Sequence, residues 1–234
     1  MEAADAVAGS VRERLASWPG HRVVEALLDR HPGVECFVAG GIVRDVLLGR
    51  EPSFGDVDLF LDGDGVDALL ADLGAHGALR TGPFGSPRWL PEGAQGYADI
   101  IPIRRFDNGL WPCEDMTDAL NQFDFTCNAV AVDLRSRELL DPQNGRRDAA
   151  RRVMRAVRFD FPPEPIARGA ELLRPAVLWF RLLHYAAAKG LAIEPLTLAW
   201  LRAQRGYLEL EPLYAETFAP LHPRALDPLR DARP

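Results

Sequence analysis

The chain has 234 residues, of which 47% are hydrophobic and 26% are charged. These proportions are typical of an ordinary soluble globular protein with one large domain or two small ones. The formal net charge of −7 argues against a broad surface that coats nucleic acid, although it leaves room for a local basic patch.

Three cysteines are present, Cys36, Cys113 and Cys127, and their spacing is not that of metal ligands. An odd number of separated cysteines indicates buried, reduced thiols in a cytosolic protein. The N-terminus lacks a basic-then-apolar signal pattern, and no apolar run approaches membrane-spanning length. We therefore expect a cytoplasmic protein that makes no membrane contact.

The N-terminal part contains an amphipathic helical pattern over Val11–Arg30. Pro19 and Gly20 are predicted to break this pattern into two helices. The Ala-rich residues 1–9 before it are predicted to fray.

The next stretch predicts a strand, a tight turn and a helix. Cys36–Ala39 is a short apolar run, Gly40 and Gly41 allow a tight turn, and Ile42–Leu48 has helical spacing that ends at Gly49. Such a turn at a helix N-terminus directs free N–H groups at one point, which suits a phosphate.

Two carboxylates follow at Asp56 and Asp58, in a stretch that predicts a second strand. Residues two apart on a strand share a face, so these carboxylates repel each other unless a cation lies between them. Mg²⁺ fits because it takes carboxylates together with phosphate oxygens. A Gly-Gly pair alone is usually a turn and an Asp-x-Asp alone is usually a solvated strand end, but the two in this order favour phosphoryl or nucleotidyl transfer.

Three further elements are predicted downstream. Val66–Leu73 has the pattern of a short helix that crosses back over the sheet, and Ala78–Trp89 that of a strand, a turn and a second strand. Tyr97–Arg105 is predicted to be a strand in which Asp99 interrupts an apolar run. A carboxylate in a buried strand needs a partner.

The run GGIVRDVLLGR, followed by GDVDLF, resembles the head domain of the class II poly(A) polymerase and CCA-adding tRNA nucleotidyltransferase family. The resemblance implies an α/β (α+β) fold, namely a polymerase-beta-like nucleotidyltransferase head with a small mixed sheet and flanking helices, followed by a short helical neck. In this family a third acid lies on the strand after the Asp-x-Asp strand, and an Arg follows five residues later. Asp99 and Arg104 reproduce that spacing, so Asp99 is expected to join Asp56 and Asp58 as a metal-binding and catalytic acid. The alternative is an Asp99 that is paired with Arg104 or Arg88.

The family's second motif, Arg-Arg-Asp-Phe-Thr-Ile-Asn-Ala, is similar to residues 122–129. The two arginines are replaced by Gln122 and Phe123, which weakens the case for tight triphosphate binding. The resemblance implies nucleotide contacts for Asp124 and Asn128, and for Gly40, Gly41 and Arg44 of the first motif. An Asx turn before the strand is the alternative for Asp124.

Six arginines then follow on a predicted helix, after a turn at Asp141 and Gly145. These arginines could form a patch that binds a triphosphate or an RNA backbone. Alternatively, they could form a solvated face that is paired with acids of the protein. The six are Arg146, Arg147, Arg151, Arg152, Arg155 and Arg158.

The Pro-rich stretch Phe159–Arg168 is the best candidate for a domain boundary. It divides the chain into a nucleotidyltransferase head domain, residues 1–158, and a short helical neck-like region, residues 159–234. Leu196–Arg205 predicts a helix, and Tyr207–Pro234 is expected to wrap the surface or to fray.

A long helix is predicted over Ala170–Lys189, ended by Gly190, and it is similar to the family's neck helix. It keeps Arg181 and offers His184 at the position of another Arg, so both are expected nucleotide contacts. The Asp and Arg that read the incoming base in the family are replaced by Pro175 and Leu178.

These features predict an enzyme that transfers a nucleoside monophosphate from a nucleoside triphosphate such as ATP to an acceptor hydroxyl. Mg²⁺ is the expected cofactor, with Mn²⁺ as a substitute, and an RNA 3′ end is the default acceptor. CCA addition itself is not expected, because the base-reading pair is absent and the chain stops where the tRNA-holding body and tail would begin. The alternatives are a non-catalytic nucleotide-binding or regulatory module, a transferase for a small molecule or protein, and an interaction protein with a structural acidic pocket.

Overall fold

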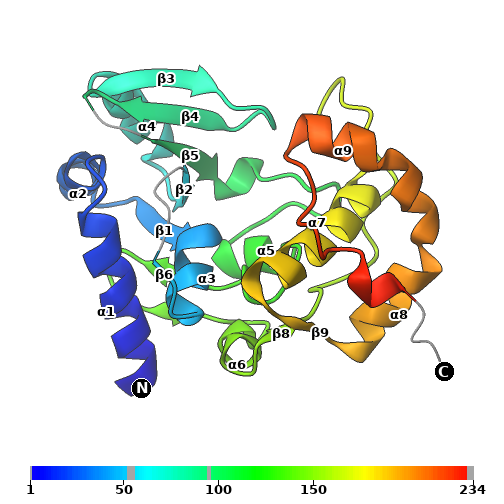
Figure 1. Cartoon of the computed structure of the whole chain (residues 1–234). Helices are drawn as coiled ribbons and strands as arrows, with labels where there is room; N and C mark the ends of the chain where they lie inside the picture. The colour runs from blue at the N-terminus through cyan, green and yellow to red at the C-terminus, as the bar shows by residue number, and fades with distance from the viewer. Residues whose placement is uncertain (1, 52–55, 94–95, 231–234) are drawn as a thin grey trace.

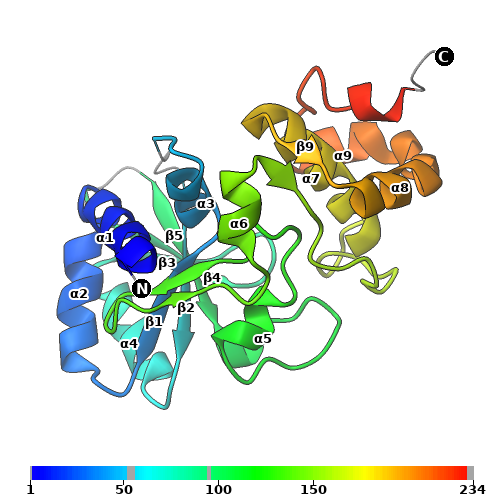
Figure 2. The ribbon, with the colours of Figure 1, turned by 90° about the horizontal axis from the view of Figure 1, so that it is seen from below.

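A computed structural model of the chain describes residues 2–51, 56–93 and 96–230 (Figure 1). Elements up to β8 gather around one sheet, and the elements from α7 onward form a second, helical group beside it in both views (Figures 1 and 2). The predicted fold class is confirmed, because the sheet has seven strands and only β2 and β5 pair in parallel. In spatial order the strands are β3 (Gly77–Thr81), β4 (Pro87–Pro91), β5 (Tyr97–Pro102), β2 (Asp56–Asp62), β1 (Glu35–Ala39), β6 (Ala131–Asp133) and β7 (Leu139–Leu140).

Strand β1 is buried on both faces, and alternation along it divides the head between two cores. Cys36 and Val38 belong to the core that the first four helices cover. Phe37 and Ala39 point the other way, into the core under α5. The covering helices are α1 (Glu2–Ala16), α2 (His21–Arg30), α3 (Gly41–Leu47), α4 (Val66–Gly74) and α5 (Met116–Leu120).

Helix α1 begins well before the predicted position. The expectation that residues 1–9 fray is wrong for the residues described, because α1 starts at Glu2 and buries Ala8, Val11 and Leu15 in the head core. Met1 lies outside the described residues. The predicted break at Pro19 and Gly20 is confirmed by the gap between α1 and α2.

The six arginines after Asp141 do not share one helix, so that prediction is wrong. Helix α6 (Gly145–Ala150) ends early, and Arg152 adopts a left-handed φ of 56° that stops helix propagation. The chain then forms β8 (Val153–Met154), which pairs with β9 (Ala192–Ile193).

The neck helix α7 (Arg174–Lys189) starts four residues later than predicted, with Pro175 in its first turn. It ends at Gly190 as predicted, where φ is +67°. Strand β5 likewise ends at Pro102, three residues before the predicted Arg105, and continues as the 3₁₀ turn η1 (Ile103–Arg105).

The C-terminal stretch folds back over α7, so the prediction that it wraps the surface is confirmed and fraying is wrong for residues 207–230. Helix α8 (Pro195–Ala203) precedes it and matches the helix predicted over Leu196–Arg205, and the stretch itself contains the end of η2 (Arg205–Leu210), α9 (Glu211–Thr217) and η3 (Asp227–Leu229). Tyr214, Ala225 and Leu229 are buried in a separate C-terminal core that also contains Phe180. Residues 231–234 lie outside the described part. No helix in the described part has the length and apolarity needed to cross a membrane.

Candidate active site

The three predicted carboxylates lie at adjacent positions of the sheet. Asp56 and Asp58 begin β2, and the parallel register with β5 places Asp58 directly opposite Asp99. On the other side of β2, Asp58 is opposite Ala39, the last residue before the Gly-Gly turn. The site therefore lies at the edge where β1 ends and where β2 and β5 begin.

The surroundings of the Asp58 carboxyl group disfavour its ionised form. Burial, followed by the nearby charges of Asp56 and Asp99, raises its pKa to about 7, and Arg181 and Arg44 oppose this rise only in part. Neither Asp56 nor Asp58 forms an ion pair with any residue that the structure describes. Such a pair of hard oxygen donors fits a divalent cation, which would relieve the repulsion.

Asp99 has a different environment, because Arg88 on β4 holds both of its oxygens. The Arg88 Nε atom donates to Asp99 Oδ1 at 2.7 Å, and Nη2 donates to Oδ2 at 2.8 Å. The same guanidinium lies 3.7 Å from the centre of the Tyr97 ring. Of the two partners considered from the sequence, the structure selects Arg88, since Arg104 pairs with Asp62 instead.

The role of Asp56, Asp58 and Asp99 as metal ligands stays a prediction, and the three side chains have different surroundings in the structure. No group of three or more His, Cys, Asp or Glu side chains in the described part of the chain is placed to hold a metal ion. Asp56 and Asp58 remain available as oxygen ligands, whereas Asp99 is turned to Arg88.

The Gly-Gly turn packs directly against these acids. Gly40 has a φ of 69° and a ψ of −130°, a conformation that glycine tolerates and L side chains rarely adopt. A Cβ atom on Gly40 would stand 2.6 Å from Asp58 Oδ2, so this close approach also requires glycine. Gly41 begins α3, and a Cβ there would be 3.6 Å from Arg44 Nη2, which places this guanidinium nitrogen at the turn.

The predicted nucleotide contacts form one polar chain that runs from α3 to α7. Arg44 Nη1 donates to Asn128 Oδ1 at 3.1 Å, and Asn128 Nδ2 donates to Asp124 Oδ1 at 3.0 Å. Arg181 Nε then donates to Asp124 Oδ2 at 2.7 Å. The guanidinium groups of Arg44 and Arg181 both lie about 5 Å from the centre of the Tyr185 ring. The backbone N–H of Phe125 also donates to Asp124 Oδ1, so the Asx-type contact weighed for Asp124 is present together with the ion pair.

A second link between the same helices was not predicted. Lys189, the last residue of α7, donates from Nζ to Asp45 on α3 at 2.9 Å. Asp45 also accepts a bond from Arg44 Nε, and these two cations lower its pKa although burial acts against them. Helices α3 and α7 are thus joined at two places, and the resemblance to the family motifs gave no signal for the second.

The residues that replace the two arginines of the second motif contribute to packing. Gln122 is buried, and its Nε2 donates to the carbonyl oxygen of Trp111. The Phe123 ring packs on Phe60 and Phe106. Neither side chain supplies a cation to the site.

The altered positions of α7 are also turned inward. Pro175 and Leu178, which stand where the family reads the incoming base, are both buried. His184 accepts a hydrogen bond at Nδ1 from the backbone N–H of His222, at 3.2 Å, so its ring faces the C-terminal segment. Burial is the main cause that lowers the pKa of His184.

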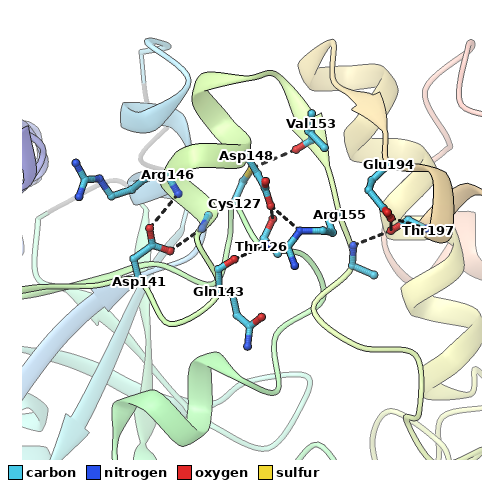
Figure 3. Close-up of polar contacts among 12 residues, drawn as sticks. Thr126, Cys127, Asp141, Gln143, Arg146, Asp148, Val153, Arg155, Glu194 and Thr197 are labelled. Carbon is cyan, nitrogen blue, oxygen red and sulfur yellow. Dashed lines mark hydrogen bonds and ion pairs between the residues drawn. The ribbon is translucent and has the colours of Figure 1, made fainter.

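The arginines around α6 divide into two groups. Arg155 donates to Asp148, which also accepts a bond from Thr126 (Figure 3). Arg152 and Arg158 are also held, by the Leu48 carbonyl and by Asp160. Arg146, Arg147 and Arg151 form no side-chain hydrogen bond or ion pair among the described residues. Arg147 and Arg151 line a hollow of about 510 Å³ between α6 and β9.

All three cysteines are buried and unpaired, as the sequence predicts. Burial raises the pKa of Cys36 and of Cys127 to about 12 and that of Cys113 to about 11. The thiols are therefore part of the packing.

Comparison with known proteins agrees with the motifs. No family model matches the chain. The chain is 33% identical over 193 residues to a multifunctional CCA protein of Xanthomonas campestris pv. campestris, covering 78% of this chain and 43% of that one. It is 33% identical over 210 residues to a CC-adding tRNA nucleotidyltransferase of Deinococcus radiodurans, covering 84% and 54%. The chain thus spans about half the length of the curated relatives that it matches.

Solved structures share the fold at lower sequence identity. A Thermotoga maritima CCA-adding enzyme complexed with tRNA is 20% identical, with a TM-score of 0.63, and the match covers 96% of this chain and 51% of that one. A CCA-adding enzyme with CTP is 21% identical, also with a TM-score of 0.63, covering 88% and 48%. Motifs, relatives and fold together show that this chain contains a head domain of the class II CCA-adding nucleotidyltransferase type.

Proposed function

We propose that the chain transfers a nucleoside monophosphate from a nucleoside triphosphate to an acceptor hydroxyl, with Mg²⁺ as its cofactor and Mn²⁺ as a substitute. The observation that carries the proposal is the position of Asp56 and Asp58 at one sheet edge, beside the Gly40 turn and without any cation from the described protein. A divalent ion bound there would align the α-phosphate and neutralise the charge of the leaving pyrophosphate.

The residues around the acids have separate roles in this proposal. Asp56 and Asp58 hold the metal ion, and Asp99, fixed by Arg88, completes the negative wall of the site as its third acid. Gly40 and Gly41 leave room for a phosphate at the turn. Arg44 directs Nη2 toward that turn while two of its other nitrogens are bonded to protein, so it can bind a phosphate oxygen without rearrangement.

Nucleotide contacts beyond the phosphates are assigned to Asp124, Asn128, Arg181 and His184. The first three support the proposal through the polar chain that joins α3 to α7. His184 is the weakest member, because its Nδ1 atom already accepts a bond from the C-terminal segment.

We propose a tRNA 3′ end as the acceptor, because the relatives named above are CCA- and CC-adding enzymes. A tRNA acceptor departs from the expectation, based on the sequence, that CCA addition does not occur; the relatives that support this acceptor are matched over about half of their length. The buried Pro175 and Leu178 still predict that base selection differs from the family pattern.

The division of the chain into two regions and its cellular location are also proposals. A head of residues 1–158 and a neck-like region of 159–234 are supported by the irregular segment before α7, although Phe125 and Met154 of the head share a core with α7. A cytoplasmic location is supported by the three reduced thiols.

Label transfer tests the function. The full chain is incubated with Mg²⁺, one α-labelled nucleoside triphosphate at a time, and tRNA transcripts that lack one, two or three nucleotides of the terminal CCA. Label should move to RNA with the wild type and not with Asp56→Asn/Asp58→Asn. Absence of transfer with every nucleotide and transcript, from a folded protein, would overturn the proposal.

A non-catalytic nucleotide-binding module is the second candidate. The observation that favours it is the pairing of Arg44, Arg181 and Asp99 within the protein. It predicts thermal stabilisation by a nucleoside triphosphate without any label transfer.

A further inference from the structure

Four aromatic rings form a continuous stack from the neck helix to the head. Phe180 on α7 stacks on Tyr214 of α9 at 4.7 Å between ring centres, and Tyr214 stacks on Phe218 at 5.0 Å. Phe218 then meets Phe84 at 5.8 Å with an interplanar angle of 22°. The figure shows the C-terminal α9 beside the tip of the β3–β4 hairpin, where the last of these contacts is made (Figure 1).

The exposed fraction of the side chains increases along this aromatic stack, from Phe180 to Phe84. Phe180 and Tyr214 are buried in the C-terminal core, whereas Phe84 is 52% exposed. A ring held by an ordered stack on one side and open to solvent on another is a preformed planar surface. A single exposed apolar residue is ordinary, but one at the end of a fixed ring stack is placed for a planar partner.

The open ring lies close to the proposed catalytic acids. Phe84 is two residues from Gly82, where a Cβ would stand 3.5 Å from Asp99 Oδ1. At the other end of the stack, Phe180 precedes Arg181, which bonds Asp124. The stack thus runs from the β3–β4 hairpin, whose Gly82 lies beside Asp99, to the neck helix.

Base recognition by the neck is altered in this chain, since Pro175 and Leu178 are buried and offer no hydrogen bonds to a base edge. An aromatic face supplies another kind of contact, because every nucleobase has a π-face and stacks on it regardless of its edge.

We propose that Phe84, supported by Phe218, is a stacking site for a nucleobase at the entrance to the catalytic acids. The base belongs either to the 3′ end of the acceptor RNA or to the incoming nucleoside triphosphate. This inference rests on the proposed function, since it assigns a subsite for one of its two substrates.

Fluorescence of 2-aminopurine tests the site and distinguishes the two sources. One arm uses an RNA oligonucleotide with 2-aminopurine at its 3′ end, and the other uses 2-aminopurine ribonucleoside triphosphate with Ca²⁺, so that binding is read without turnover. Stacking on Phe84 quenches the probe, and the arm that shows the quenching names the source.

Three variants of the full chain separate stacking from packing. Phe84→Ala should weaken binding of that probe by about tenfold and remove the quenching, and Phe84→Tyr should restore both. Phe84→Leu keeps an apolar contact to Phe218 without a π-face, so it should behave like Phe84→Ala. Leu79→Ala, at a 39%-exposed position on the same hairpin, is the matched control and should bind as the wild type does.

Quenching that persists in Phe84→Ala, or wild-type binding by Phe84→Leu, would overturn the stacking site and leave Phe84 as an apolar contact that holds α9. Because label transfer is measured separately, wild-type transfer without Phe84-dependent quenching would reject this inference alone. Loss of transfer with intact quenching would reject the transferase instead.

Discussion

Arg88 holds both carboxylate oxygens of Asp99 at 2.7 and 2.8 Å, directly beside Asp56 and Asp58, which form no ion pair with any residue in the described part of the chain. The pairing fixes the orientation of Asp99 across the β4–β5 register, where the two residues are opposite each other. It also neutralises one of three neighbouring negative charges. Of the three acids, Asp99 is therefore paired with a cation of the protein, whereas Asp56 and Asp58 have no such partner among the described residues.

Substitution of Arg88 by Gln should release Asp99 toward Asp56 and Asp58. We expect tighter Mn²⁺ binding by Arg88→Gln than by the wild type, measured by electron paramagnetic resonance of free Mn²⁺. The free energy of unfolding without metal should fall by about 1–3 kcal/mol, because two charge-assisted hydrogen bonds are lost. Arg80→Gln, on the neighbouring exposed strand, is the control for loss of one positive charge. Unchanged Mn²⁺ affinity in Arg88→Gln would show that Asp99 is not a potential metal ligand.

Asp58 predicts an unusual dependence of stability on pH in the absence of metal. Its pKa is raised to about 7, first by burial and then by Asp56 and Asp99, whereas an unfolded Asp titrates near ~3.9. Between these values the folded state keeps a proton that the unfolded state has released. This contribution to the free energy of unfolding therefore falls as the pH rises from about 4 to about 7, and is constant above.

The variant Asp58→Asn should be more stable than the wild type at pH 8 in EDTA, by on the order of 2–4 kcal/mol. The difference should fall below about 1 kcal/mol near pH 4, where the Asp58 carboxyl of the folded protein is protonated. Urea unfolding of both proteins at the two pH values measures the effect. Equal stability at pH 8 would mean that the carboxylate of Asp58 is well solvated or paired.

Local sequence patterns were sufficient to predict several turns and the ends of several elements. The turn at Gly40, the strand that starts at Asp56 and the helix stop at Gly190 all depend on neighbours in the sequence, and all are confirmed. The end of α6 could not be predicted, because no glycine or proline in the sequence marks the position at which Arg152 adopts a left-handed φ.

The sequence could not predict which side chains pair between different strands of the sheet. Arg88 and Arg104 were equal candidates for Asp99 until the hairpin register placed Arg88 opposite it. The same limit applies to the C-terminal segment, whose Tyr214 is buried only because α7 supplies a matching face.

The ion pair between Asp124 and Arg181 joins the second motif to the neck helix, and we expect it to contribute to stability. A double-mutant cycle with Asp124→Asn and Arg181→Gln should give a coupling energy of about 1–2 kcal/mol in urea unfolding. Asp124 keeps its bonds from Phe125 and Asn128 in the Arg181 variant, so that side chain should stay in place. A coupling energy near zero would indicate that the ion pair does not contribute to the stability of the protein.

Two glycines in the first motif provide a matched pair for the Gly-Gly turn. Gly40 and Gly49 both have positive φ, of 69° and 64°, so an alanine is strained at either position. At Gly49 nothing lies within 4 Å of an added Cβ, whereas at Gly40 the Cβ would stand 2.6 Å from Asp58 Oδ2. Gly49→Ala should therefore lose about 1 kcal/mol of stability and keep both metal binding and label transfer.

Gly40→Ala should displace the Asp58 carboxylate or the turn, and so weaken Mn²⁺ binding and reduce label transfer by at least about 100-fold, since a displacement of about 1 Å is sufficient for such a loss. Thermal unfolding of both variants controls for misfolding, because the comparison is valid only where each melts cooperatively. If Gly40→Ala binds Mn²⁺ as Gly49→Ala does, the contact between the turn and Asp58 has no role in placing the metal ion.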